Sequence, residues 1–280
     1  MEKKLLKPKN DIVFQSLFSK ENEEITKNFV QSLLGKKISK IEINNNKELF
    51  RERPEDKLGI LDLQVDIDDE EKIDVEIQLI DKYNLVDRLL YYFSRLYAET
   101  IKIGDEYEKS KRIVLIAILD YDLELTKFLE EMQTQWMLRE TKNPEIILTN
   151  KLEIDIIELR KVKKEYEKNK HNEKAQWMLF LDDPNSKEVH EIMEENKEIN
   201  DAVLIVHEMT EDEKMERLAF LREKAILDER SMHYHGVKEG IEQGERSKAL
   251  EIAKKMKNKK MSIETIAEIT GLTKEEVENL

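Results

Sequence analysis

Two neighbouring stretches of alternating apolar and polar residues constrain the fold of this chain most strongly. They lie within LGILDLQVDIDDEEKIDVEIQLI, residues 58–80. A period of two indicates strands with one apolar and one polar face. The polar faces carry Asp62, Gln64, Asp66, Asp74, Glu76 and Gln78. Carboxylates are poor strand formers and repel one another across a sheet, so this face is either wet surface or the binding site of something positive.

A hairpin that keeps the two apolar faces together has two natural registers. Asp62 lies beside Glu76 in the first register, and beside Gln78 with Glu76 on the diagonal in the second. Either register brings these three side chains within reach of one point. Two carboxylates, the main-chain carbonyl of Ile77 and several waters suit Mg2+, for which Mn2+ can substitute. An ordinary solvated face is the alternative, because the chain contains 62 acidic residues.

The patterns around this hairpin predict a mixed sheet with helices packed on it, an α/β (α+β) fold. Apolar residues at helical spacing predict helices over residues 10–35 and 81–104, each ending at a glycine. An alternating segment at 38–43 predicts a short strand. The nearly continuous apolar run at 111–119 predicts a strand that is buried on both faces.

The helix expected after the hairpin has an apolar stripe and a polar face. The stripe comprises Val86, Leu89, Leu90, Phe93, Leu96, Tyr97 and Ile101. Arg88, Tyr92 and Arg95 are expected on the opposite face, where they contact solvent or a DNA backbone.

The second half of the chain becomes helical. Residues 126–138 are predicted to be a helix, and residues 144–150 and 151–159 are predicted to be strands. Beyond about residue 160 we expect helices, with a break at 182–188 and a long polar helix at 237–257. Residues 1–160 are therefore expected to form one domain, and residues 161–280 a helical C-terminal region.

Composition excludes several classes of protein. The chain has no cysteine, which excludes disulfides and thiolate metal sites and favours the reducing cytoplasm. No apolar run approaches the roughly 20 residues of a membrane span. The formal charge of −14 argues against coating nucleic acid by bulk attraction. We expect a soluble cytoplasmic protein that does not bind membranes.

Several segments together resemble the PD-(D/E)XK nuclease superfamily, in particular its Rpn-like group of recombination-promoting nucleases and transposases. In order, the segments are KNDIVFQSLF, DKLGILDLQV, VEIQL, DRLLYYFSRLYAETIKIGDEY and KRIVLIAIL. They cover roughly residues 8–120, and the glycines of EGIEQGE in the tail also look like this group.

The resemblance implies an αβββαβ nuclease core in which Asp62 and Glu76 bind Mg2+. It places Gln78 where the wider superfamily usually has lysine. A glutamine offers a neutral amide donor in place of an ammonium charge, so the metal must do more of the work. Asp11 stands at the position of an acidic residue in the first helix of this group. It either completes the site through water or serves as charge at the helix N-terminus.

The resulting expectation is a Mg2+-dependent DNA endonuclease acting in recombination or transposition. The alternative is a nuclease-fold scaffold that binds DNA or protein without cutting. MSIETIAEITGLTKEEVENL, residues 261–280, has helix-turn-helix spacing, but its acidic second half favours a helical hairpin for packing or self-association. The exposed helical arm and the need to cut two strands predict a homodimer through the C-terminal helices.

Overall fold

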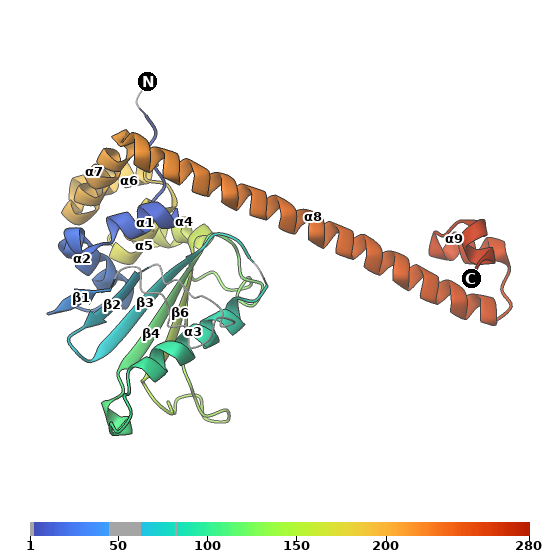
Figure 1. Ribbon diagram of the computed structural model, residues 1–280, viewed down its shortest axis with the longest axis horizontal. Helices are drawn as coiled ribbons and strands as arrows, with labels where there is room; N and C mark the ends of the chain where they lie inside the picture. The colour runs from blue at the N-terminus through green and yellow to red at the C-terminus, as the bar shows by residue number, and fades with distance from the viewer. Residues whose placement is uncertain (1–2, 45–62, 82) are drawn as a thin grey trace. The chain divides into compact units, whose positions relative to one another are not determined.

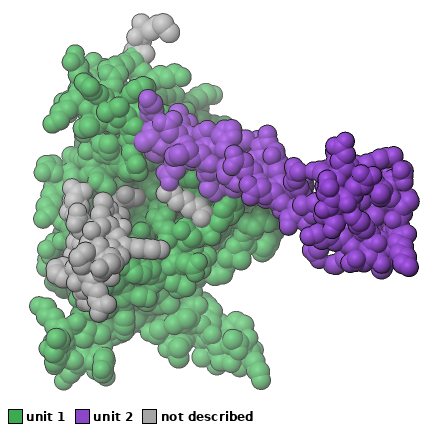
Figure 2. All heavy atoms as spheres, turned by 45° about the vertical axis from the view of Figure 1, so that its right-hand side comes forward, with its two compact units in different colours: residues 1–223 green, residues 224–280 purple. Residues whose placement is uncertain are grey.

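The computed structural model describes residues 3–44, 63–81 and 83–280. The chain divides into two compact units, residues 1–223 and 224–280 (Figure 2). The domain boundary expected near residue 160 stays a prediction. In the structure, helices beyond residue 160 share the hydrophobic core of the first unit, which explains why that unit extends to Glu223.

A six-stranded mixed sheet forms the centre of the described part of the first unit. Its strands are β1 (Ile41–Ile43), β2 (Leu63–Ile67), β3 (Glu71–Gln78), β4 (Arg112–Leu119), β5 (Gln133–Trp136) and β6 (Leu152–Glu158). Their order across the sheet is β1-β2-β3-β4-β6-β5; Figure 1 labels all of them except β5. The strands β3, β4 and β6 run parallel, and the remaining neighbours are antiparallel. The predicted fold class is confirmed.

The hairpin of β2 and β3 has the pairing of the first predicted register. Leu63 lies opposite Val75. Between the strands, Asp68 and Asp69 have φ values of 50° and 61°, a left-handed conformation that aspartate tolerates better than most residues. The Asp68 carboxylate also accepts a hydrogen bond from the main-chain N–H of Lys40 at 2.8 Å. The turn chemistry therefore fixes the register that separates the two faces.

Helices cover both faces of the sheet (Figure 1). The helix α3 (Leu85–Glu99) packs on the face that carries Glu76 and Gln78, against alternate residues of β4. The opposite face packs against α1 (Asp11–Leu17), α2 (Glu23–Leu34), α4 (Leu159–Lys168), α5 (Glu173–Asp182), α6 (Lys187–Glu195) and α7 (Lys197–Glu211). The strand β4 is buried on both sides, as its apolar run predicts.

The helix predicted over residues 10–35 is two helices in the structure. The helices α1 and α2 are separated by a 3-10 turn, Lys20–Asn22. Asn22 donates side-chain hydrogen bonds to carbonyls at the end of α1, including that of Leu17 at 2.9 Å. Gly35 ends α2 in the left-handed conformation at φ 65°, which confirms it as the stop.

The phase of α3 differs from the prediction by one residue. Its buried residues are Leu85, Leu89, Tyr92 and Leu96. Val86 and Leu90 are about half exposed, so they do not belong to the stripe that packs on the sheet. The helix also ends at Glu99, before the predicted stop at Gly104. Tyr92 and Arg88 consequently face the sheet, and the prediction that they lie on the outer face is wrong.

The helix predicted over residues 126–138 does not form. Its second half is β5, which pairs antiparallel with β6 and extends the sheet. The main-chain N–H and C=O groups of β5 bond to β6 instead of within a helix. The spacing of apolar residues in this segment does not reveal that partner. The strand predicted at 144–150 is also wrong, because the segment contributes just one isolated bridge, Ile147 with Arg139. The strand predicted over 151–159 is confirmed as β6.

The chain beyond residue 160 is helical, as predicted. The break at 182–188 separates α5 from α6, and the polar helix predicted over 237–257 is part of α8 (Glu213–Asn258). A Cβ added at Gly236, Gly240 or Gly244 would meet nothing within 4 Å. Among the described residues, therefore, no other helix packs closely against these three glycines.

The second unit ends in two short helices, α9 (Ile263–Thr270) and α10 (Lys274–Glu278). Gly271 joins them at φ 71°, and Thr273 with Glu276 forms a capping box at the start of α10. The small core of this unit comprises Ala253, Ile266, Leu272 and Val277. In the described part of the chain, every helix is too short or too polar to cross a membrane.

Candidate active site

The polar residues of β3 gather under α3, towards the carboxyl end of the strand. Asp74 and Glu76 are 0% and 2% exposed, and Gln78 is half-buried. Ala117 of β4 lies beside Glu76 in the parallel register. Ala117 is fully buried between the sheet and α3. The carboxyl ends of parallel strands commonly form binding sites in open sheets, so this position suits chemistry.

The structure brings two of the predicted site residues together. The amide Nε2 of Gln78 donates a hydrogen bond to Oε2 of Glu76 at 3.2 Å. Asp62 lies outside the described residues, directly before β2, and its place in the site stays a prediction. The side chain of Ile77 packs in the core on the opposite face of the sheet. The group predicted to bind a metal is its main-chain carbonyl, and this stays a prediction.

Asp11 has a different environment. Its Oδ2 lies 2.7 Å from Nε of Arg222, and its Oδ1 accepts from the main-chain N–H of Ile12 at 3.0 Å. Asn10 is the N-cap of α1, and Asp11 supplies negative charge in the first turn. The contacts described for Asp11 therefore match its alternative role as negative charge at the N-terminus of α1. Its role in the site stays a prediction.

Arg88 is the residue that the sequence patterns placed wrongly and that the structure brings to the site. Its Nη1 donates to Oε1 of Gln78 at 2.7 Å, and its Nη2 lies 3.8 Å from Oε2 of Glu76. Nη2 also donates to the hydroxyl of Tyr92 at 3.4 Å. The site therefore contains a guanidinium, an amide and a carboxylate from two adjacent elements, α3 and β3.

Two tyrosines complete the walls of this site. Burial, then the Glu76 carboxylate, raises the pKa of Tyr92. Burial, then the Asp81 carboxylate, raises the pKa of Tyr121 to about 12. Both hydroxyls are thus protonated at neutral pH. Burial by itself lowers the pKa of Arg88, but Tyr92 and Glu76 outweigh it and the net shift is upward, so the guanidinium stays charged.

The end of β4 is tied to the N-terminal segment beside this site. The main-chain N–H of Asp120 donates to the carbonyl of Gln78 at 2.9 Å. Lys9 Nζ donates to the Asp120 carboxylate at 3.0 Å and to that of Asp182 at 2.6 Å. Lys9 therefore fixes the loop after β4 next to Gln78. The sequence patterns did not single out this lysine.

The described donor set fits a hard divalent cation in its chemistry. The Glu76 carboxylate and the Ile77 carbonyl are oxygen ligands of the kind that Mg2+ prefers. Burial of the Glu76 carboxylate at 2% exposure favours a compensating positive charge. Within residues 3–44, 63–81 and 83–280, no three acidic, histidine or cysteine side chains are arranged to hold a metal. The second predicted carboxylate, Asp62, falls outside those ranges.

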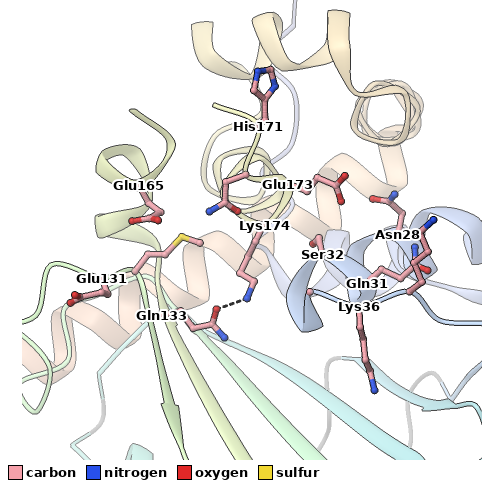
Figure 3. A pocket seen from close by; sticks show the side chains of 14 residues that line it. Asn28, Gln31, Ser32, Lys36, Glu131, Gln133, Glu165, His171, Glu173 and Lys174 are labelled. Atoms are coloured by element: carbon pink, nitrogen blue, oxygen red, sulfur yellow. Dashed lines mark hydrogen bonds between the residues drawn. The ribbon is translucent and has the colours of Figure 1, made fainter. Parts of the chain in front are cut away.

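Two cavities lined by described residues lie on the opposite face of the sheet. One of about 780 Å3 opens between α2, β5 and the start of α5, with Lys174 bonded to Gln133 (Figure 3). An adjoining cavity of about 280 Å3 reaches Glu153 and Asp155 of β6. None of the predicted site residues lines either cavity. Burial, then Glu153, raises the pKa of Asp155 to about 6.

Comparison with known families gives two matches. Residues 8–235 match the model for the PD-(D/E)XK nuclease family transposase. Residues 246–280 match the Rpn/YhgA-like nuclease family, C-terminal HTH domain. Searches of curated proteins and of solved structures give no significant match. The second match favours a helix-turn-helix over the packing hairpin that the acidic residues of the tail indicated.

Proposed function

The chain belongs to the PD-(D/E)XK nuclease family transposases, and from this premise we propose that it is a Mg2+-dependent DNA endonuclease. Asp62, Glu76 and the main-chain carbonyl of Ile77 hold the ion, and Mn2+ substitutes for it. The placement of Glu76 beside Gln78 under α3 is the observation that carries the proposal. Glu76, Ile77 and Gln78 form the E-x-Q motif of this chain, and the resemblance implies that its two polar residues lie together in the site.

Each residue has a distinct task in this mechanism. Mg2+ held by Asp62, Glu76 and the Ile77 carbonyl would supply Lewis-acid chemistry: it would polarise the phosphate and acidify the water that displaces the 3′ oxygen. Glu76 would supply a carboxylate oxygen to the ion. Gln78 uses one N–H on Glu76, and its second N–H positions the water. Tyr92 and Tyr121 exclude bulk solvent from the walls of the site.

The direct test is cleavage of supercoiled plasmid in the presence of Mg2+. We expect the protein to nick or linearise the plasmid, and Asp62→Ala and Glu76→Ala to lose this activity. Glu106→Ala is the matched control, because its carboxylate is exposed on the surface of the same unit. Equal cutting by the protein, Asp62→Ala and Glu76→Ala would place the activity elsewhere or in a contaminant.

A second candidate function is DNA binding without cleavage, favoured by the match of residues 246–280 to an HTH domain. The helix α10 is acidic, whereas the end of α8 and the turn that follows it carry Lys254, Lys255, Lys257, Lys259 and Lys260. These lysines suit phosphate contacts better than α10 does. A gel shift without Mg2+ tests this. Replacing the five lysines with glutamine is expected to abolish the shift, and an unchanged shift would refute this contact surface.

Other features of the expected biology stay proposals. They are a role in recombination or transposition, a homodimer formed through the C-terminal helices, and a cytoplasmic location. Sedimentation of the full chain tests the dimer, since a monomer at micromolar concentration would refute it.

A further inference from the structure

Arg88 lies in an unusual position for a charged helix residue. Its side chain is 28% exposed, although it belongs to an amphipathic helix with ample solvent-facing surface. Its guanidinium carbon lies 5.7 Å from the ring centroid of Tyr92, within the range of a cation–π contact. Partial burial of a cation costs free energy unless nearby groups compensate, so these contacts hold Arg88 in the site against solvation.

Arg88 determines the orientation of Gln78. Because Nη1 donates to Oε1 of Gln78, the amide must direct Nε2 the other way, toward Oε2 of Glu76. Without Arg88 the two ends of the amide could exchange, and the carbonyl oxygen would then face the Glu76 carboxylate. Arg88 therefore positions the amide donor of the E-x-Q pair.

Arg88 also retains donors for a ligand. A guanidinium has five N–H groups, and the hydrogen bonds described here engage two of them, with Gln78 and with Tyr92. Its distance of 3.8 Å from Glu76 is too long for a hydrogen bond. The planar fork of arginine matches the oxygens of a phosphate better than any other side chain.

We propose that Arg88 binds the scissile phosphate and supplies the positive charge that glutamine at position 78 lacks. The inference rests on the proposed nuclease function. Lysine at position 78 would carry this charge from β3, whereas here it comes from α3, ten residues later in the chain. Arg88 is then a catalytic residue through the phosphate and a positioning residue through Gln78.

Such a role has two physical signatures besides cleavage. One phosphate contact contributes about 0.9 to the slope of log K against log salt concentration for duplex DNA. The guanidinium also repels a cation bound at Glu76, so removing its charge is expected to tighten Mg2+ binding about three- to tenfold. A residue that merely supports the fold would change neither quantity in these directions.

The test compares Arg88→Gln, Arg88→Lys and the control Arg217→Gln, which removes an exposed arginine of α8. Binding to a labelled 30-base-pair duplex is measured by anisotropy in Ca2+ over a range of salt concentrations. Mg2+ binding without DNA is measured by calorimetry, and kcat and KM are measured on plasmid. Circular dichroism reports the fold of each variant.

We expect Arg88→Gln to lower the salt slope by about one unit, tighten Mg2+ binding and lower kcat about 100-fold with less change in KM. Arg88→Lys should restore the salt slope but not the full kcat, because an ammonium cannot hold Gln78 and the phosphate together. Arg217→Gln should behave like the unaltered protein.

The failures are distinguishable. If the unaltered protein cuts and a folded Arg88→Gln cuts equally with the same salt slope, the inference is wrong and the nuclease function stands. If the unaltered protein does not cut, the nuclease function is wrong, but a lower salt slope in Arg88→Gln still supports phosphate binding by Arg88. If Arg88→Gln does not fold, Arg88→Lys takes its place in the test. A kcat of Arg88→Lys equal to that of the unaltered protein would then refute the role of the planar guanidinium.

Discussion

Two carboxylates on the same polar face of the β2–β3 hairpin have opposite surroundings. Asp66 accepts hydrogen bonds from Lys111 at 2.8 Å, Lys72 at 2.9 Å and Asn44 at 2.9 Å. Glu76, at the other end of the face, accepts from the neutral amide of Gln78, and Arg88 stands 3.8 Å away. Asp66 is thus bound by two lysines, whereas the contacts described for Glu76 are with a neutral amide and with one arginine at 3.8 Å.

This difference separates a structural carboxylate from a functional one. Burial raises the pKa of Asp66, but hydrogen bonds from Lys111 and Lys72 outweigh it, and the net shift is downward. Its charge is therefore part of the fold. Because Lys72 and Lys111 already neutralise Asp66, the nuclease proposal assigns the metal to the Glu76 end of the face.

The largest expected effect is the loss of plasmid cleavage when Glu76, and not Asp66, is neutralised. Glu76→Gln should lower plasmid cleavage about 1,000-fold or more, because it removes the negative charge that holds the metal. Its unfolding free energy should stay the same or rise, since a buried charge becomes neutral. Cleavage kinetics and urea unfolding measure the two quantities. A loss of activity in Glu76→Gln that merely parallels unfolding would break the comparison.

Asp66→Asn should show the reverse behaviour. It removes the carboxylate that pairs with Lys72, whose side chain is 9% exposed, and is expected to cost about 3 kcal/mol of unfolding free energy. The pKa of Asp66 is lowered by folding, so its stabilisation is present above the unfolded value near 3.8 and is lost as pH falls through the folded pKa. Urea unfolding at pH 7 and at pH 3 measures this.

The folded fraction of Asp66→Asn is expected to cut plasmid at close to the normal rate. A variant that is as stable as the unaltered protein but fails to cut would assign Asp66 to the site and remove the distinction between the two ends.

Gln78→Ala should lower plasmid cleavage less than Glu76→Gln or Asp62→Ala does. A neutral amide positions water but does not hold the metal, so we expect kcat to fall about 10- to 100-fold. Steady-state kinetics on plasmid provide the measurement, with Asp62→Ala beside it. If Gln78→Ala is more damaging than Glu76→Gln, the metal does not carry the chemistry.

The smallest expected effect concerns Asp155, on the opposite face of the sheet. This carboxylate is buried near another carboxylate, Glu153. Its pKa is raised to about 6 in the folded protein, so the protein loses stability as pH rises from about 4 to 6. Asp155→Asn should remove this loss, giving about 1–2 kcal/mol more stability than the unaltered protein at pH 7 and little difference at pH 4. Thermal unfolding across this pH range tests it, and a gain that is independent of pH would contradict it.

The sequence determines much of this fold through periodicity. The alternation in residues 58–80 predicts which side of each strand is polar, and the period of two places Glu76 and Gln78 on one face of β3. The run at 111–119 is apolar on both sides and must be a central strand. The E-x-Q pair therefore could be located before the structure was known.

Two features could not be predicted, for identifiable physical reasons. The helix α3 is apolar over a wide arc that includes Val86 and Leu90, so spacing does not fix its phase. The polar face of β3 decides it, because Arg88 and Tyr92 can reach groups there that leucines cannot satisfy. The strand β5 depends on pairing with β6, which follows it in the sequence.

A calorimetric titration with Mg2+ tests the central claim most directly, using the unaltered protein, Glu76→Gln and Asp66→Asn. The account predicts one binding event in the unaltered protein, its loss in Glu76→Gln and its retention in folded Asp66→Asn. Binding that persists in Glu76→Gln, or that disappears in Asp66→Asn alone, would contradict the assignment of the metal to the Glu76 end of the face.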